Sequence, residues 1–219
     1  MAEPHVFHDV NKPNEKDLGP VGAPMKEEHF LRGSTQFLKD CALLKFEAVE
    51  KAIAAGAKDI NVGDVLDQTP IILLSRNRYD PDDIPKAVRM IELLVKNGAK
   101  VLHDRTGRCI RDQYGDSMLH LAAMQTGTNN HLVLKALVDA LPEATRSKLV
   151  SEKCKNFGNT ALHWATLTGN VEACSLLIEA GSTLTRKNKQ REDVLAYANK
   201  YEHVKLKVKY EALLEKVDK

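Results

Sequence analysis

The chain has 219 residues, of which 43% are hydrophobic, 28% are charged and 5% are aromatic. The formal net charge of +2 offers no global basic field for nucleic acid, and no apolar run reaches the length of a membrane span. The four cysteines contain no C-x-x-C pair, so we expect reduced thiols rather than disulfides or a zinc finger. Because the N-terminus lacks a signal-peptide pattern, a cytoplasmic or nuclear location is favoured.

Residues 1–33 contain four of the eight prolines and show no helical or strand periodicity. This composition predicts a flexible N-terminal tail. His5 and His8 lie in the tail at a spacing that two metal ligands could have, but no third ligand accompanies them. We therefore expect no metal site, and no cofactor.

Residues 158–181, GNTALHWATLTGNVEACSLLIEAG, predict a short helix, a turn and a second helix. Thr160 can cap the first helix with its side-chain oxygen. The second helix has an apolar stripe at 3.6-residue spacing, and Gly181 ends it as a left-handed residue would. One such unit cannot bury its stripe alone, so similar units must stack on both sides.

The motif G-x-T-x-L-H-x-A in this segment resembles the ankyrin repeat, which has a period near 33 residues. The resemblance implies an all-α repeat solenoid, an ankyrin stack of helix-turn-helix units with short β-hairpin tips. It also implies protein binding through the tips and the concave face of the first helices, without catalysis. It extends over an ankyrin-repeat domain at 34–200, with about five repeats of which the outer two are degenerate.

The second repeat opens with DVLDQTPII at 64–72, where Thr69 is expected to cap the helix and Pro70 to begin it. Asp67 replaces the usual glycine, which is tolerable because Asp enters the left-handed region more readily than most residues. Ile72 replaces the usual histidine, so this tip should lose one hydrogen-bonded tie. After an insertion at 75–86, the second helix should resume at Ala87.

The third repeat begins near 112–120 and follows a lengthened connection at 100–110. A further insertion at 142–152 predicts an extra helical turn that Pro142 begins. In the fifth repeat, Arg191 and Asp193 stand at the positions of the motif's glycine and threonine, as in a capping repeat. The sequence leaves open whether the insertions at 75–86, 100–110 and 142–152 have a function.

The C-terminal segment gives two conflicting signals. Residues 203–210, HVKLKVKY, alternate as a strand would, whereas Leu206, Tyr210, Leu213 and Val217 follow helical spacing. Because a helical stack offers no long sheet edge, we predict a C-terminal capping helix over 201–219.

Two histidines invite a catalytic interpretation. His120 and His163 both occupy the motif's histidine position, where the resemblance implies hydrogen bonds between tip and helix. Asp80, Asp82 and Asp83 resemble part of a calcium loop, but two prolines interrupt it and no glutamate follows at its end. No nucleotide-binding or nucleophile motif is present. We therefore predict a protein that is not an enzyme and has no catalytic residues.

Aromatic, Met and Arg side chains near the tips have the composition of a binding hot spot. Tyr114 and Phe157 precede the tip glycines of adjacent repeats and should stand side by side, either for binding or for packing. Trp164 likewise either lines the concave face or packs between repeats. The predicted partner-binding residues are Asp64, Asp67, Arg76, Asn77, Gln113, Tyr114, Met124, Gln125, Lys155, Asn156, Phe157, Trp164, Leu167 and Thr168.

These features predict a monomeric protein-interaction module that binds another protein, with no small-molecule substrate, nucleic acid or membrane as partner. Charge along the tips changes from aspartate in the second and third repeats to lysine in the fourth and fifth. The repeat arrangement is also similar to that of the fungal ankyrin chaperone of a small-subunit ribosomal protein, although that chaperone is acidic. Two alternatives follow: a chaperone or escort of a ribosomal or other basic protein, and an inhibitor or adaptor of a signalling or transcription protein, including a pathogen effector.

Overall fold

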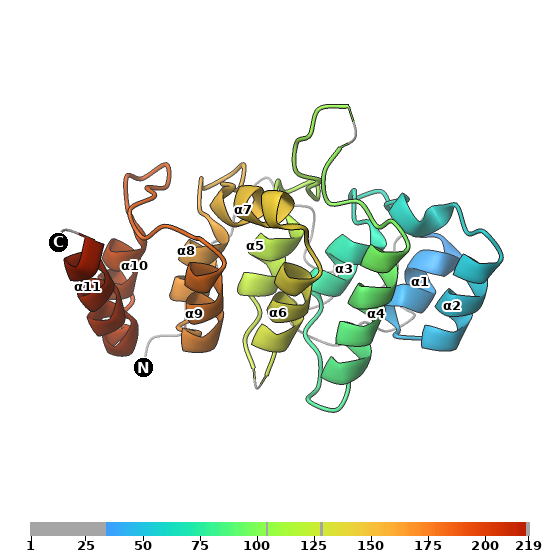
Figure 1. Cartoon of the computed structure of the whole chain (residues 1–219), viewed down its shortest axis with the longest axis horizontal. Helices are drawn as coiled ribbons and strands as arrows, with labels where there is room; N and C mark the ends of the chain where they lie inside the picture. Colours follow the sequence, from blue (N-terminus) through green and yellow to red (C-terminus); the bar gives the residue numbers. More distant parts are fainter. Residues whose placement is uncertain (1–33, 104, 128, 218–219) are drawn as a thin grey trace.

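The computed structural model describes residues 34–103, 105–127 and 129–217, and the predicted tail, with His5 and His8, lies outside them. These residues form an elongated row of helices (Figure 1). In chain order the elements are α1 (Gln36–Ala42), α2 (Phe46–Ala54), the 3₁₀ turn η3 (Asp59–Asn61), α3 (Pro70–Arg76), α4 (Ile84–Lys96), α5 (Met118–Ala123), α6 (His131–Asp139), α7 (Glu143–Ser151), α8 (Ala161–Leu167), α9 (Val171–Glu179), α10 (Val194–Lys200) and α11 (Val204–Val217).

The helices form two layers. α1, α3, α5, α8 and α10 pack side by side as a row of first helices, and α2, α4, α6 and α9 continue as a row of second helices. Each first helix packs on the helix that follows it, which defines helix pairs one to five: α1–α2, α3–α4, α5–α6, α8–α9 and α10–α11. Short α7 stands outside the pairs and contacts α8. The predicted all-α stack of helix-turn-helix units is confirmed.

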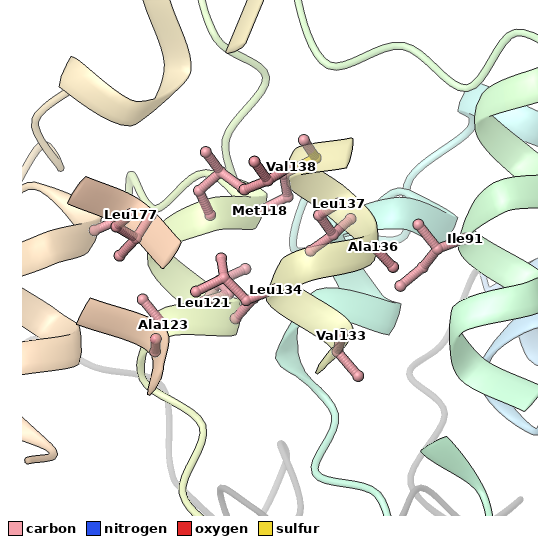
Figure 2. Packing of buried hydrophobic residues seen from close by; sticks show 14 of the residues in the cluster. Ile91, Met118, Leu121, Ala123, Val133, Leu134, Ala136, Leu137, Val138 and Leu177 are labelled. Atoms are coloured by element: carbon pink, nitrogen blue, oxygen red, sulfur yellow. The ribbon is translucent and has the colours of Figure 1, made fainter. Parts of the chain in front are cut away.

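A continuous hydrophobic core holds the stack together. It runs from Phe37 in α1 to Tyr210 in α11, without interruption between neighbouring pairs. Figure 2 shows its centre, where Leu134 and Leu137 of α6 lie among side chains of the flanking helices. Each fully buried leucine contributes roughly 2 kcal/mol relative to an exposed one, so every pair is stabilised mainly by its neighbours.

The predicted β-hairpin tips are turns rather than paired strands. Four tips, at 64–69, 112–117, 154–160 and 188–193, precede helix pairs two to five and are called the second to fifth tips. Each is closed by a backbone hydrogen bond such as Asp112 N to Asp116 O at 3.0 Å. In the described part of the chain the only strand-like contact outside helices is an isolated bridge between Leu102 and Cys109. Each tip reverses the direction of the chain within five or six residues, which is too short for a ladder of paired strands.

Two insertions differ in detail from their predictions. α4 begins at Ile84 and not at Ala87, because Pro85 falls in the first turn, where a missing N–H costs nothing. The preceding loop is anchored by Tyr79, a buried side chain whose hydroxyl donates to Leu74 O at 3.0 Å. The turn expected after Pro142 is α7, more than two turns long.

The C-terminal segment is helical, as predicted. α11 packs on α10 as the second helix of the last pair, and the Tyr210 hydroxyl reaches Thr166 Oγ1 in α8 at 2.7 Å. None of the helices in the described ranges is long and apolar enough to cross a membrane.

Candidate functional site

The four tips are joined to one another by backbone hydrogen bonds. Gln113 N donates to Leu66 O at 3.0 Å, Lys155 N to Gly115 O at 3.1 Å, and Lys189 N to Phe157 O at 2.9 Å. Each bond crosses from one tip to the next. The tips therefore form a row with a fixed spacing, and side chains on neighbouring tips are held next to each other.

The tip row depends on a left-handed residue in every tip. Asp67, Gly115, Gly158 and Arg191 have φ values of 57°, 84°, 68° and 64°. The prediction that Asp67 tolerates this conformation is confirmed, and Arg191 does the same. Gly115 has a second constraint, because a Cβ atom there would lie 2.2 Å from Lys155 Cβ in the next tip.

His120 and His163 connect tips to helices. Ser117 N donates to His120 Nδ1 at 3.2 Å, so the ring proton sits on Nε2, which donates to Asn159 O at 3.1 Å in the following tip. His163 makes the equivalent bonds to Thr160 and to Glu192 O. Both rings are fully buried, and burial lowers the pKa of His120 to about 3. Their predicted structural role is confirmed.

The second tip lacks this tie, as predicted from Ile72. Thr69 has the backbone conformation of a helix cap, but its hydroxyl does not cap α3 and has no hydrogen-bond partner among the described residues. The expected cap from Thr69 was therefore wrong. In the third and fourth tips the cap hydroxyls of Ser117 and Thr160 lie within hydrogen-bond distance of the histidine Nδ1. Ile72 has no polar side-chain atom that could take this place.

Arg76 and Tyr114 come together near the second and third tips. Helical side chains lean toward the helix N-terminus, so Arg76 at the end of α3 extends back toward the tips. Its guanidinium carbon lies 5.9 Å from the centroid of the Tyr114 ring. Burial raises the pKa of the Asp64 and Asp112 carboxyl groups, and the positive charge of Arg76 opposes that rise.

Phe157 and Trp164 form the next aromatic contact along the row. Their ring centroids are 5.7 Å apart and their planes meet at 87°, an edge-to-face arrangement. Both residues are half-buried, so each ring presents part of its surface to solvent. Lys155, which is exposed, stands beside them on the fourth tip. We call Arg76, Tyr114, Lys155, Phe157 and Trp164 the tip surface.

Three side chains of the tip surface carry hydrogen-bonding groups without a partner in the described part of the chain. They are Arg76 Nη1, the Tyr114 hydroxyl and Trp164 Nε1, all of which can donate. Native proteins leave few buried polar atoms unsatisfied, and an unmade bond costs about 1–3 kcal/mol. Because the three atoms are buried, an acceptor from outside the chain could reach them only after the side chains rotate.

The predicted binding residues divide between two ends of the first helices. The tip surface is joined by Asp64, Asp67, Gln113 and Asn156, the last three being exposed on the turns. The others lie at the C-terminal ends of α3, α5 and α8, where Asn77 and Gln125 are only 5% and 4% exposed. This second group consists of Asn77, Met124, Gln125, Leu167 and Thr168.

Two hollows lie away from the tip surface. One of about 490 Å³ separates α4 from α6, and one of about 370 Å³ lies among the loops that precede α6 and α9. His120 and His163 line neither of them. Within the described ranges, no three His, Cys, Asp or Glu side chains converge as metal ligands would.

One segment of the stack matches a known protein family. Residues 157–189, which contain the fourth tip, α8 and α9, match the ankyrin repeat family. Residues 157–189 are an ankyrin repeat. No curated protein sequence matches it. The ankyrin repeat is a protein-interaction fold, and the matched segment supplies Phe157 and Trp164 of the tip surface.

Sequence reasoning missed one group of exposed cations near the tips. Arg105, Arg108 and Lys148 come from the insertions, and the sequence alone does not bring these distant segments together. Only one nearby segment stands out by its composition: residues 183–191 hold four cations and no Asp or Glu.

Proposed function

We propose that this protein is a non-enzymatic binding module that holds a protein partner on its tip surface. The observation that carries the proposal is the set of three unsatisfied donors on Arg76, Tyr114 and Trp164. A partner that presents main-chain carbonyl or carboxylate oxygens could accept from them after small side-chain rotations. Half-buried aromatic rings beside these donors supply the apolar contact that interface hot spots require.

The tip row supports tight binding in a second way. Backbone bonds between tips, and the histidine ties to the following tips, hold the surface in one arrangement before a partner arrives. A preformed surface loses little conformational entropy on association. Binding free energy is then not consumed in ordering the tips.

The escort of a basic protein is not the function we favour. The cations Lys155, Lys187 and Lys189 on and beside the fourth and fifth tips make no ion pair within the described ranges. A basic partner would be repelled there. No particular residue favours the role of an inhibitor over that of an adaptor.

Affinity capture with the intact chain tests the proposal. Tyr114→Ala with Phe157→Ala should lose the proteins that the parent chain retains, because it removes two anchor rings of the tip surface. The matched control is Leu132→Ala with Val208→Ala, two exposed apolar side chains away from the tips. Unfolding curves should show that both variants remain folded. Equal retention by the two double variants would exclude the tip surface as the binding site.

A further inference from the structure

Two insertions and one interrepeat segment bring cations together on the same edge of the stack as the tips. The connection at 100–110 stands away from the stack beside α7 (Figure 1). We call six exposed side chains on these segments the basic ridge: Arg105, Arg108, Lys148, Lys153, Arg186 and Lys187.

Hydrogen bonds to backbone carbonyls hold the three segments against one another. Lys148 Nζ on α7 donates to Gly107 O in the projecting connection. Arg186 Nη2 donates to Ser151 O at 3.3 Å, and Lys153 Nζ donates to Lys187 O. The segments that carry the ridge are therefore adjacent, although they are far apart in sequence.

The positive charge of the basic ridge is not neutralised by the described residues. None of its six side chains has a carboxylate within 4.0 Å in those ranges. The nearby Glu152 carboxylate is occupied by Arg111, with Arg111 Nη2 2.8 Å from Glu152 Oε2. Asp104 follows His103 in the sequence and lies outside the described residues. The known contacts of the ridge cations are to neutral carbonyl oxygens, which leave their charge available.

We propose that the basic ridge binds an extended acidic segment, rich in Asp and Glu, of the protein partner. Carboxylates on such a segment could pair with these cations, three of which (Lys148, Lys153 and Arg186) are already held by carbonyl contacts. The inference rests on the proposed function in taking the partner to be a protein. It uses none of the five tip-surface residues, so the two can fail separately.

The charge distribution favours an acidic protein segment over nucleic acid. A nucleic acid is negative along its whole length, whereas the second and third tips, next to the ridge, carry Asp64, Asp67 and Asp112. A protein can change the sign of its surface charge along the stack. The ridge itself has no aromatic side chain on which bases could stack, and such rings are the usual platform for single strands.

Fluorescence anisotropy with the full chain provides the test. The probes are a fluorescein-labelled peptide that alternates Glu with Ser, the same peptide with Gln for Glu, and a labelled single-stranded RNA of equal charge. The acidic peptide should bind, with affinity falling roughly tenfold as salt is raised from about 50 to 200 mM. The ridge variant Arg105→Glu, Arg108→Glu, Lys187→Glu should raise its Kd about tenfold or more.

A charge-matched control keeps the test specific. Lys51→Glu, Lys58→Glu, Lys96→Glu changes the same number of exposed cations, none of them on the three ridge segments, and it should shift the Kd about twofold at most. Tyr114→Ala with Phe157→Ala should also leave peptide binding in place. The proposal is overturned if the Gln peptide binds equally well, if both triple variants lose binding equally, if nothing binds at about 1 mM peptide, or if the RNA binds more tightly than the acidic peptide.

Discussion

His120 Nε2 lies 3.1 Å from the carbonyl oxygen of Asn159, so a side chain in α5 holds the tip of the next helix pair. His163 repeats the relationship with Glu192 O at 3.1 Å, one pair further along. The second pair has Ile72 in this position and leaves the Thr69 hydroxyl without a partner in the described part of the chain. The stack is therefore tied more firmly between pairs three, four and five than between two and three.

Replacing His120 by isoleucine, the residue that pair two uses, tests the value of this tie. His120→Ile should destabilise the protein by about 1–3 kcal/mol, because it leaves Ser117 N buried without a partner and removes one of the two hydrogen bonds to Asn159 O. Urea unfolding measures the change. The reciprocal Ile72→His gives the Thr69 hydroxyl a partner and should be neutral or stabilising by about 1 kcal/mol. Equal unfolding midpoints for His120→Ile and the parent chain would contradict the role assigned to the ring.

Stability should fall as the solution becomes mildly acidic. Burial lowers the pKa of His120 to about 3, and that of His163 also falls, while an unfolded histidine titrates near about 6.5. The native state then binds fewer protons, so this contribution is complete above about pH 6.5 and is lost as pH falls toward 3.

Urea unfolding at about pH 7.5 and 5.5 measures this effect, with a loss of about 1.4 kcal/mol per pH unit below 6.5 for His120 and a further loss for His163. Asp64 and Asp112, whose pKa values are raised by burial, act in the opposite direction: they contribute stability at low pH that is lost as pH rises through the folded pKa. His120→Ile should show a shallower pH dependence, and an unchanged slope would contradict the assignment.

Gly115 differs from the other left-handed glycines because Lys155 of the next tip lies close to it. Gly115→Ala should cost about 1–2 kcal/mol for the positive φ and more for the 2.2 Å approach to Lys155 Cβ. Gly98→Ala is the matched control, since Gly98 has φ 93° and a Cβ atom there would meet nothing within 4 Å. Thermal unfolding should place Gly115→Ala clearly below Gly98→Ala. Identical transitions would mean that the tips are not in contact there.

Tyr210 tests the docking of the last helix. Its side chain is fully buried and its hydroxyl is 2.7 Å from Thr166 Oγ1, so Tyr210→Phe should cost about 1–2 kcal/mol. Tyr201→Phe removes a hydroxyl that makes no hydrogen bond in the described ranges and should change stability by less than about 0.5 kcal/mol. If the two variants unfold alike in urea, α11 does not dock through this hydroxyl.

Local sequence signals predicted much of the stack because each repeat is specified by residues close together in the chain. The motif histidines, the turn residues at 67, 115, 158 and 191, and the apolar spacing in α9 all act within a few residues. The errors were also local: the start of α4, the missing cap at Thr69 and the strands expected at the tips. Each of these features depends on backbone and side-chain geometry that the residue pattern alone does not determine.

By itself, the sequence determined the order of helices and turns, because capping, left-handed turns and 3.6-residue spacing are short-range effects. Only the tertiary structure decided which side chains meet across repeats. It placed Arg76 beside Tyr114, and it brought together the segments that carry Arg105, Lys148 and Lys187. The physical reason is that these contacts depend on how far each pair is displaced and rotated on its neighbour, which is set by packing of the shared core.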